Sequence, residues 1–240
     1  MFVIIDTIKM VNYKDIQVIF FDYGGTLDAD GVAWKELFYP LYLKYGITVS
    51  KEIFSSAFYR ADDSLVGDDI ISFSLKNIIY EQVRRVLTNL KIHDSHLNEK
   101  IAEDFYQASV EKIEENKMVL SKLKQKYRLG IISNNYGNLQ SICDETGLSQ
   151  FMDILVDSTC VGFTKPDRRI FIHALEALNV KPEKALMVGD SLTRDMEGAK
   201  ARGMKHIFLV SHHNKNSMVC CCPQDPVISN LSQLLDILKI

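Results

Sequence analysis

The chain has 240 residues, of which 47% are hydrophobic and 25% are charged, with a formal net charge of −3. This length suits one large domain or a core with a smaller inserted unit, and the charge excludes the strongly basic surface that nucleic acid requires. No apolar run is long enough for a membrane span, and the N-terminus lacks the pattern of a signal peptide. We therefore expect a cytoplasmic protein that acts on a small molecule, as a monomer or homodimer, with no nucleic acid or membrane as partner.

The first predicted strand, residues 18–21, is an apolar run that ends at Asp22, and Gly24 and Gly25 follow in a turn. Here a carboxylate stands where a buried strand opens into a glycine-rich loop. An aspartate in such a position is a candidate nucleophile for phosphoryl transfer, because that reaction needs a well-placed oxygen and little else from the protein.

Residues 30–111 show the spacing of several amphipathic helices and no convincing strand. Because this stretch begins directly after the Asp22 turn, we predict an inserted α-helical cap domain over the carboxyl ends of the strands, where open α/β sheets bind ligands. Candidate substrate contacts in the cap are its arginine and aromatic side chains, Arg60, Arg84, Arg85, Tyr42, Tyr45, Phe54, Phe58 and Tyr59.

Strands and helices alternate after residue 112. Strands are predicted at 129–132, 154–156, 185–188 and 206–210, and helices at 118–127, 138–146, 168–178, 194–202 and 232–238. This alternation is typical of a parallel sheet covered on both faces. We predict an α/β fold with a Rossmann-like core that is discontinuous, 1–29 and 112–240, and a cap at 30–111.

Further polar residues follow the later predicted strands. Ser133 could donate a hydrogen bond to a phosphate oxygen, although, taken alone, a serine here is more often explained by capping of the next helix. Lys165, just before Pro166, could neutralise anionic charge or lie exposed on the surface. Asp190 and Asp195 offer the oxygen ligands that Mg²⁺ takes, although a helix cap and a first-turn acid would also account for them.

The order of Asp22, Ser133, Lys165 and Asp190 with Asp195 resembles the four-motif pattern of the haloacid dehalogenase-like hydrolase superfamily, over nearly the whole chain. The helical insertion after the first motif looks like the C1-type cap of its subfamily I. This resemblance implies that Asp22 is a nucleophile that forms an aspartyl-phosphate intermediate. It also implies that Ser133 and Lys165 bind the transferring phosphoryl group.

The same resemblance implies a Mg²⁺ cofactor. Its ligands would be Asp22, Asp190 and the main-chain carbonyl of Gly24, with Asp195 either touching the metal or orienting Lys165. Phosphate contacts in addition to Ser133 and Lys165 are expected at the first two motifs, from Gly24, Gly25, Thr26 and Asn134.

One position departs from the superfamily pattern. Most of its phosphatases carry an aspartate two residues after the nucleophile, which protonates the leaving group and then activates water, whereas this chain has Gly24. The backbone contact to the metal survives this change. The proton transfer does not, and general acid–base catalysis typically contributes about 10²- to 10⁴-fold. We predict a Mg²⁺-dependent phosphatase for small phosphorylated molecules with acidic leaving groups.

Three explanations of the missing acid stay open. In the first, Asp28 or Asp30 supplies the proton, although solvated loop acids are the simpler interpretation of both. In the second, the reaction is dehalogenation, which needs no proton on the leaving group, or a phosphonatase-like reaction that uses a cap lysine such as Lys35, Lys44 or Lys51. In the third, the chain is a catalytically weak phosphate-binding or regulatory module.

The five cysteines are not expected to form a disulfide framework, because their number is odd and their spacing irregular. Three of them, Cys220, Cys221 and Cys222, are consecutive. They lack the paired spacing of a zinc site, and adjacent residues do not easily all face one ion. We interpret this run as a loop with incidental thiols.

Overall fold

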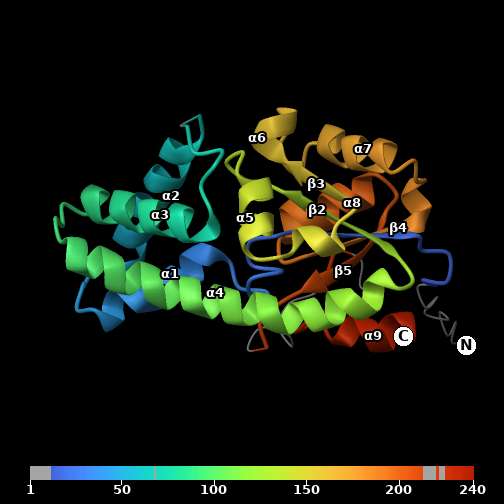
Figure 1. Ribbon diagram of the computed structural model, residues 1–240, viewed down its shortest axis with the longest axis horizontal. Coiled ribbons are helices and arrows are strands. Elements are labelled where there is room, and N and C mark those ends of the chain that lie inside the picture. The colour runs from blue at the N-terminus through green and yellow to red at the C-terminus, as the bar shows by residue number, and fades with distance from the viewer. Residues whose placement is uncertain (1–11, 68, 213–219, 222–224) are drawn as a thin grey trace, which may run out of the picture.

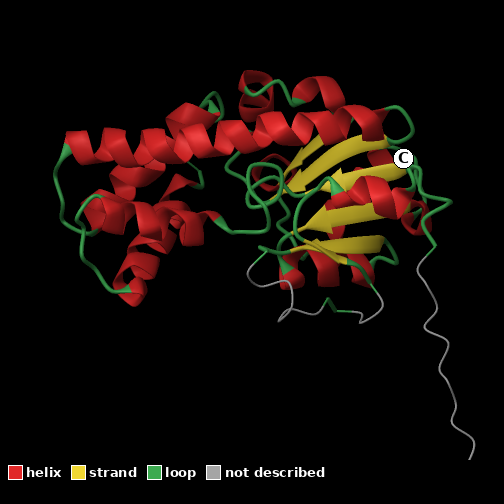
Figure 2. Ribbon diagram, turned by 90° about the horizontal axis from the view of Figure 1, so that it is seen from below, coloured by secondary structure: helices red, strands yellow, loops and turns green. Residues whose placement is uncertain are grey.

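A computed structural model describes residues 12–67, 69–212, 220–221 and 225–240. It contains a six-stranded parallel sheet in the order β3-β2-β1-β4-β5-β6, with helices on both faces (Figure 2). The predicted α/β fold is therefore confirmed. The strands are β1 (Val18–Phe21), β2 (Arg128–Ser133), β3 (Ile154–Asp157), β4 (Ala185–Gly189), β5 (Lys205–Leu209) and β6 (Val227–Ile228).

The central strand β1 is buried on both sides, which explains its unbroken apolar sequence. Because successive side chains of a strand alternate between faces, Val18 and Phe20 join one hydrophobic cluster and Ile19 and Phe21 the other. Helices α7 (Arg168–Ala177) and α8 (Gly198–Ala201) contribute to the first cluster. The second includes side chains of α4 (Ser95–Lys124), α5 (Leu139–Glu145) and α9 (Gln233–Leu238).

Four helices occupy the region predicted as a cap: α1 (Trp34–Lys44), α2 (Lys51–Leu65), α3 (Leu75–Asn89) and the first part of α4. The described residues between 30 and 111 include no strand, as expected. Figure 1 shows α1, α2 and α3 grouped at one end of the molecule, with α4 extending from them along the sheet. The separate helix expected at 118–127 is wrong, because these residues continue α4 as far as Lys124. This helix also crosses residue 111, so the division into core and cap stays a prediction.

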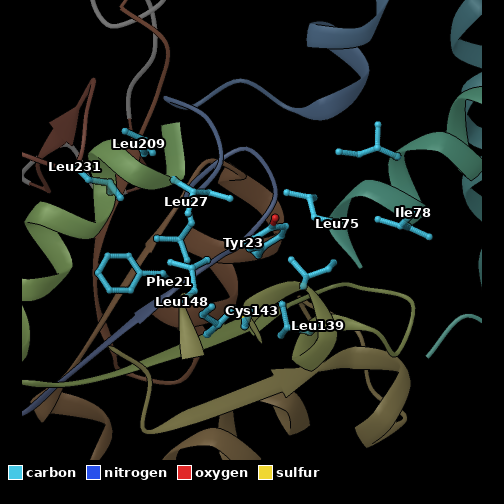
Figure 3. Close-up of a cluster of buried hydrophobic side chains, with 14 of the residues drawn as sticks. Phe21, Tyr23, Leu27, Leu75, Ile78, Leu139, Cys143, Leu148, Leu209 and Leu231 are labelled. Atoms are coloured by element: carbon cyan, nitrogen blue, oxygen red, sulfur yellow. The ribbon is translucent and has the colours of Figure 1, made fainter. Parts of the chain in front are cut away.

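A hydrophobic cluster joins the helical region to the sheet (Figure 3). Tyr23 and Leu27, on the loop after β1, pack in it with Leu75 of α3 and Leu139 of α5. Full burial of a leucine side chain contributes about 1.5 to 3 kcal/mol, so these contacts fix the loop that carries Asp22. The loop next to Asp22 is therefore held by side chains from both parts of the chain.

Two local elements differ from the expected ones. The helix expected at 194–202 is a π-helical segment, Leu192–Glu197, that continues into the short α8. Strand β6 has only two residues, too few to give a recognisable periodicity. Short helices complete the structure: α6 (Ser158–Val161) and the 3₁₀ turns Ser149–Phe151 and Pro182–Lys184. In the described part of the chain, no helix combines the length and apolar character needed to cross a bilayer.

Candidate active site

Three neighbouring strands bring the predicted residues together at one edge of the sheet. Asp22 follows β1, Ser133 ends β2 and Asp190 follows β4, and β1 lies between the other two. The Asp22 main-chain N–H donates to the carbonyl of Val188 at 2.9 Å, which extends the β1–β4 pairing by one residue, to Asp22. The carboxyl edge of a parallel sheet is where such folds bind ligands.

Lys165 reaches this edge from the loop before α7. Its Nζ lies 2.8 Å from Asp22 Oδ1 and 2.6 Å from Asp195 Oδ1, and all three side chains are buried. Burial alone would lower the pKa of Lys165, but the carboxylates of Asp195 and Asp22 outweigh burial and raise it above its ordinary value. The lysine is therefore an ammonium ion next to Asp22. The interpretation as an exposed surface lysine is wrong.

Asn134 and Asp195 hold Lys165 in place. The Asn134 side chain accepts from the Lys165 N–H at 2.7 Å and donates to the Lys165 carbonyl at 3.0 Å. Asp195 uses its second oxygen to accept from the Ser191 N–H at 3.0 Å. Both carboxylate oxygens of Asp195 are thus engaged. It is fully buried rather than an exposed first-turn acid.

A cluster of carboxylates surrounds this ammonium. Asp22, Asp190 and Asp195 each place an oxygen within 4.8 Å of the others. Burial, followed by the charges of Asp22 and Asp195, raises the pKa of Asp190 well above its ordinary value. Asp22 and Asp195 are buried and Asp190 is partly exposed, and these three carboxylates stand near one lysine, so a divalent cation would balance the remaining charge. An all-oxygen donor set of this kind fits Mg²⁺.

The glycine turn after Asp22 allows the cluster to close. Thr26 Oγ1 donates to Asp190 Oδ1 at 3.2 Å. Gly25 has φ of +87°, and a Cβ atom there would lie 2.5 Å from Asp190 Oδ2. Only glycine adopts this positive φ readily and also leaves room for the Asp190 carboxylate, because it has no Cβ atom.

Gly24 differs from Gly25, because its φ lies outside the left-handed region. A Cβ atom at Gly24 would meet Trp34 Nε1 at 3.5 Å, an ordinary van der Waals distance. The backbone therefore admits a side chain at the position where the superfamily pattern has an aspartate. Sterics at Cβ do not require this glycine.

Asp28 and Asp30 differ in burial and in their hydrogen-bond partners, although they are only two residues apart. Asp28 is only 3% exposed; its Oδ1 accepts from the Gly25 N–H at 2.7 Å and its Oδ2 from Trp34 Nε1 at 2.5 Å. Burial raises the pKa of Asp28 to about 7, although both donors oppose that effect. The interpretation of Asp28 as a solvated acid is wrong. Asp30 is partly exposed and bonds Lys112 Nζ at 2.8 Å.

A small cavity of about 60 Å³ lies beside Asp22 and shares four residues with a larger one of about 570 Å³, beside α1 and α2. The larger volume lies in the range of small-molecule sites. The small cavity is lined by Asp22, Gly24, Ser133, Asn134, Lys165 and Arg194.

Only some of the cap candidates reach the larger cavity. Phe58 and Tyr59 line it, but the three predicted arginines do not. Arg84 and Arg85 bind Glu81 on their own helix. Tyr42 and Phe54 are buried in the helical core, Tyr45 donates to Asp104, and Arg60 donates to a main-chain carbonyl.

Sequence reasoning missed Arg194, Trp34 and Tyr136, all of which line the larger cavity. Arg194 also lines the small one. Its place directly before Asp195, in the fourth motif, was the available signal for this arginine. Trp34 is the single tryptophan of the chain and follows the first motif by a few residues, which is a weak signal. No feature of the sequence pointed to Tyr136, which donates a hydrogen bond to Asp62.

A family model described as haloacid dehalogenase-like hydrolase matches residues 16–203. Glyceraldehyde 3-phosphate phosphatase of Methanothermobacter thermautotrophicus is 39% identical over 126 residues, 48% of this chain and 54% of that protein. Haloacid dehalogenase-like hydrolase domain-containing protein 3 of Bos taurus is 36% identical over 118 residues, which are 47% of this chain and 45% of that protein. These matches thus span about half the length of each relative.

Among solved structures, a dehalogenase with an intermediate complex superimposes with a TM-score of 0.64, over 95% of this chain and 99% of that one. Its sequence is 18% identical. At this level of identity the likeness concerns the fold alone.

Proposed function

Because the chain belongs to the haloacid dehalogenase-like hydrolase family, we propose that it is a Mg²⁺-dependent phosphatase of small phosphorylated molecules. The observation that carries this proposal is the buried Lys165 ammonium 2.8 Å from Asp22, beside two further carboxylates. A nucleophile, a cation for the phosphoryl oxygens and a hard-metal donor set are what phosphoryl transfer needs. The similarity to a glyceraldehyde 3-phosphate phosphatase supports the same reaction.

In the proposed reaction, a carboxylate oxygen of Asp22 attacks phosphorus. The bond from that oxygen to phosphorus forms while the bond to the leaving oxygen breaks, and the departing group takes the electron pair. Water then attacks the aspartyl-phosphate, releases phosphate and restores Asp22. Ser133 and Lys165 hold the phosphoryl oxygens throughout, because both line the small cavity next to Asp22.

The proposed Mg²⁺ ligands are Asp22, Asp190 and the Gly24 carbonyl. When bound there, the ion would neutralise charge on the phosphoryl oxygens. We assign Asp195 to orienting Lys165, because both of its oxygens already accept from Lys165 Nζ and the Ser191 N–H. Asn134 supports the same lysine through its backbone.

Asp28 is assigned a positioning role in this proposal. A leaving-group acid must come within hydrogen-bond distance of the departing oxygen, and geometry precedes pKa in judging a candidate. Asp28 is buried, lies outside the lining of both cavities and binds Gly25 and Trp34. The proton donor lost at Gly24 therefore has no replacement in this assignment, and substrates with acidic leaving groups, such as acyl or aryl phosphates, fit best.

A phosphonatase-like reaction is disfavoured by the state of the cap lysines. A lysine that forms a Schiff base must be a neutral amine. Of the three candidates only Lys35 lines the larger cavity. Burial would lower its pKa, but Tyr59 and Glu36 outweigh burial and raise it. Lys44 and Lys51 pair with Asp104 and Glu36.

The test of the proposed function is a screen of acyl phosphates, aryl phosphates, alkyl phosphates and 2-haloacids, each with and without Mg²⁺. We expect phosphate release from acyl and aryl phosphates that stops when a chelator removes the metal. Halide release without metal would identify a dehalogenase. If every substrate stays intact while phosphate still binds, the chain is a binding module.

Asp28→Asn tests the positioning role. An amide cannot accept from both Gly25 and Trp34, so one of these donors would face an NH₂ group. We expect kcat to fall by about tenfold, the cost of one such hydrogen bond, and to fall equally for aryl and alkyl phosphates. Asp30→Asn, on the same loop, is the matched control and should leave kcat unchanged. A loss confined to alkyl phosphates would instead make Asp28 the leaving-group acid.

A further inference from the structure

A second cluster of potential metal ligands lies away from the candidate active site. It combines His206 of β5 with Cys220 and Cys221, and Asp225 lies beside it just before β6. In the strand order, β4 separates β5 from β1, the strand that carries Asp22. Neither cavity at the nucleophile includes any of these four residues.

The ligand atoms of His206, Cys220 and Cys221 all lie within 4.8 Å of one another. The two sulfur atoms are 4.0 Å apart, and Cys221 Sγ is 3.2 Å from His206 Nε2. Two thiolates on one tetrahedral zinc ion, each about 2.3 Å from it, lie about 3.8 Å apart. The adjacent cysteines therefore do face a common point, contrary to the expectation from sequence. Cys222 lies outside the described residues.

The imidazole of His206 is oriented as in a metal ligand. Its Nδ1 faces the carbonyl of Met204 at 3.4 Å, an acceptor only, so we place the ring hydrogen on Nδ1. Nε2 then turns a lone pair toward the sulfur of Cys221 and the carboxylate of Asp225. The Cys221 thiol lies within hydrogen-bond distance of this nitrogen, whereas the Asp225 carboxylate oxygen approaches it without a hydrogen bond, and a cation there would relieve that repulsion.

Asp225 supplies a second, independent observation. Its side chain is 8% exposed, and its Oδ2 lies 2.7 Å from His206 Nε2. Yet this oxygen makes no hydrogen bond among the described residues, so the close approach lacks hydrogen-bond geometry. The contact also differs from a catalytic triad, in which the nucleophile and the carboxylate bind different nitrogens of the imidazole. Here both groups crowd the same nitrogen.

We propose that His206, Cys220 and Cys221, with the Asp225 carboxylate completing the shell, bind a structural Zn²⁺ ion. Nitrogen, sulfur and carboxylate oxygen are the ligands that zinc takes in four-coordinate sites. The ion would tie the segment containing Cys220 and Cys221 to the β5 edge of the sheet. This site is independent of the proposed phosphatase activity.

The experiment uses the full chain in excess Mg²⁺, which occupies the carboxylate cluster and leaves the sulfur ligands for the softer metal. We expect one tightly held zinc ion per chain. Replacement by Co²⁺ should give a thiolate-to-cobalt charge-transfer absorption in the near ultraviolet. Cys221→Ser should remove this absorption and weaken zinc binding by more than about 100-fold, since outer partners of a ligand alone cost 10- to 100-fold.

Cys160→Ser is the matched control, because the Cys160 thiol is exposed and donates to the Gly137 carbonyl instead. It should keep both the zinc and the cobalt absorption. A wild-type cobalt spectrum without a thiolate band would overturn the proposal, even if Cys221→Ser fails to fold. Equal loss of zinc in Cys160→Ser and Cys221→Ser would overturn it as well.

Discussion

Asp22→Asn should lower kcat for phosphate release by at least about 10⁴-fold, the scale seen when a catalytic nucleophile is removed. An amide oxygen is a poor nucleophile, so the aspartyl-phosphate cannot form. The change keeps the shape of the side chain, and Lys165 keeps its partner Asp195 at 2.6 Å. The loss should therefore come from chemistry and not from unfolding. The measurement is steady-state turnover of an aryl phosphate in Mg²⁺, with the melting temperature recorded for each variant.

Asp30→Asn serves as the control for this effect, because Asp30 lies in the same loop and pairs with Lys112 outside the small cavity. Its kcat should match that of the wild type. Retained turnover in a pure, folded Asp22→Asn protein would remove Asp22 from the nucleophile role.

Gly24→Asp should raise kcat/KM for alkyl phosphates by at least about 10²-fold and by no more than about 10⁴-fold. The reason is that it places a general acid where most phosphatases of the superfamily carry an aspartate. The backbone there suits an L-residue, and the new Cβ would contact Trp34 Nε1 at 3.5 Å. Aryl phosphates should gain little, since their leaving groups need no proton. The measurement compares kcat/KM for one alkyl and one aryl phosphate in both proteins.

Gly25→Ala is the contrasting variant. Its Cβ would lie 2.5 Å from Asp190 Oδ2 at a φ of +87°, so activity should fall on every substrate. This pair of neighbouring glycines separates a tolerated substitution from a disruptive one. A folded Gly24→Asp protein with unchanged alkyl activity would contradict the account of Gly24.

Much of the fold followed from local pattern. The apolar run before Asp22 and the later alternation of strands and helices predicted the parallel sheet, because strands buried on both faces carry unbroken apolar sequence. Asp22, Ser133 and Asp190 stand at the ends of predicted strands, but these residues and Lys165 could be selected only because their order resembles the superfamily pattern. Their roles in catalysis stay proposals.

Other features depend on contacts between distant parts of the chain. Asp28 looked solvated because loop acids usually are, but in the fold it is buried and accepts hydrogen bonds from Gly25 and Trp34. His206 stands in a strand with no metal-ligand spacing, and its contact with Cys221, 15 residues later, appears only in the fold. The length of α4 was missed because a continuous helix gives no signal at a presumed domain boundary.

The most direct test of the central account is rapid-quench labelling during steady-state turnover of an aryl phosphate carrying labelled phosphorus. The aspartate that usually activates water is replaced here by Gly24, so hydrolysis of the aspartyl-phosphate should be slow. Most of the wild-type enzyme should then carry phosphate on Asp22, while Asp22→Asn should carry none. Rapid turnover with no labelled protein at any time would contradict both the nucleophile and the role assigned to Gly24.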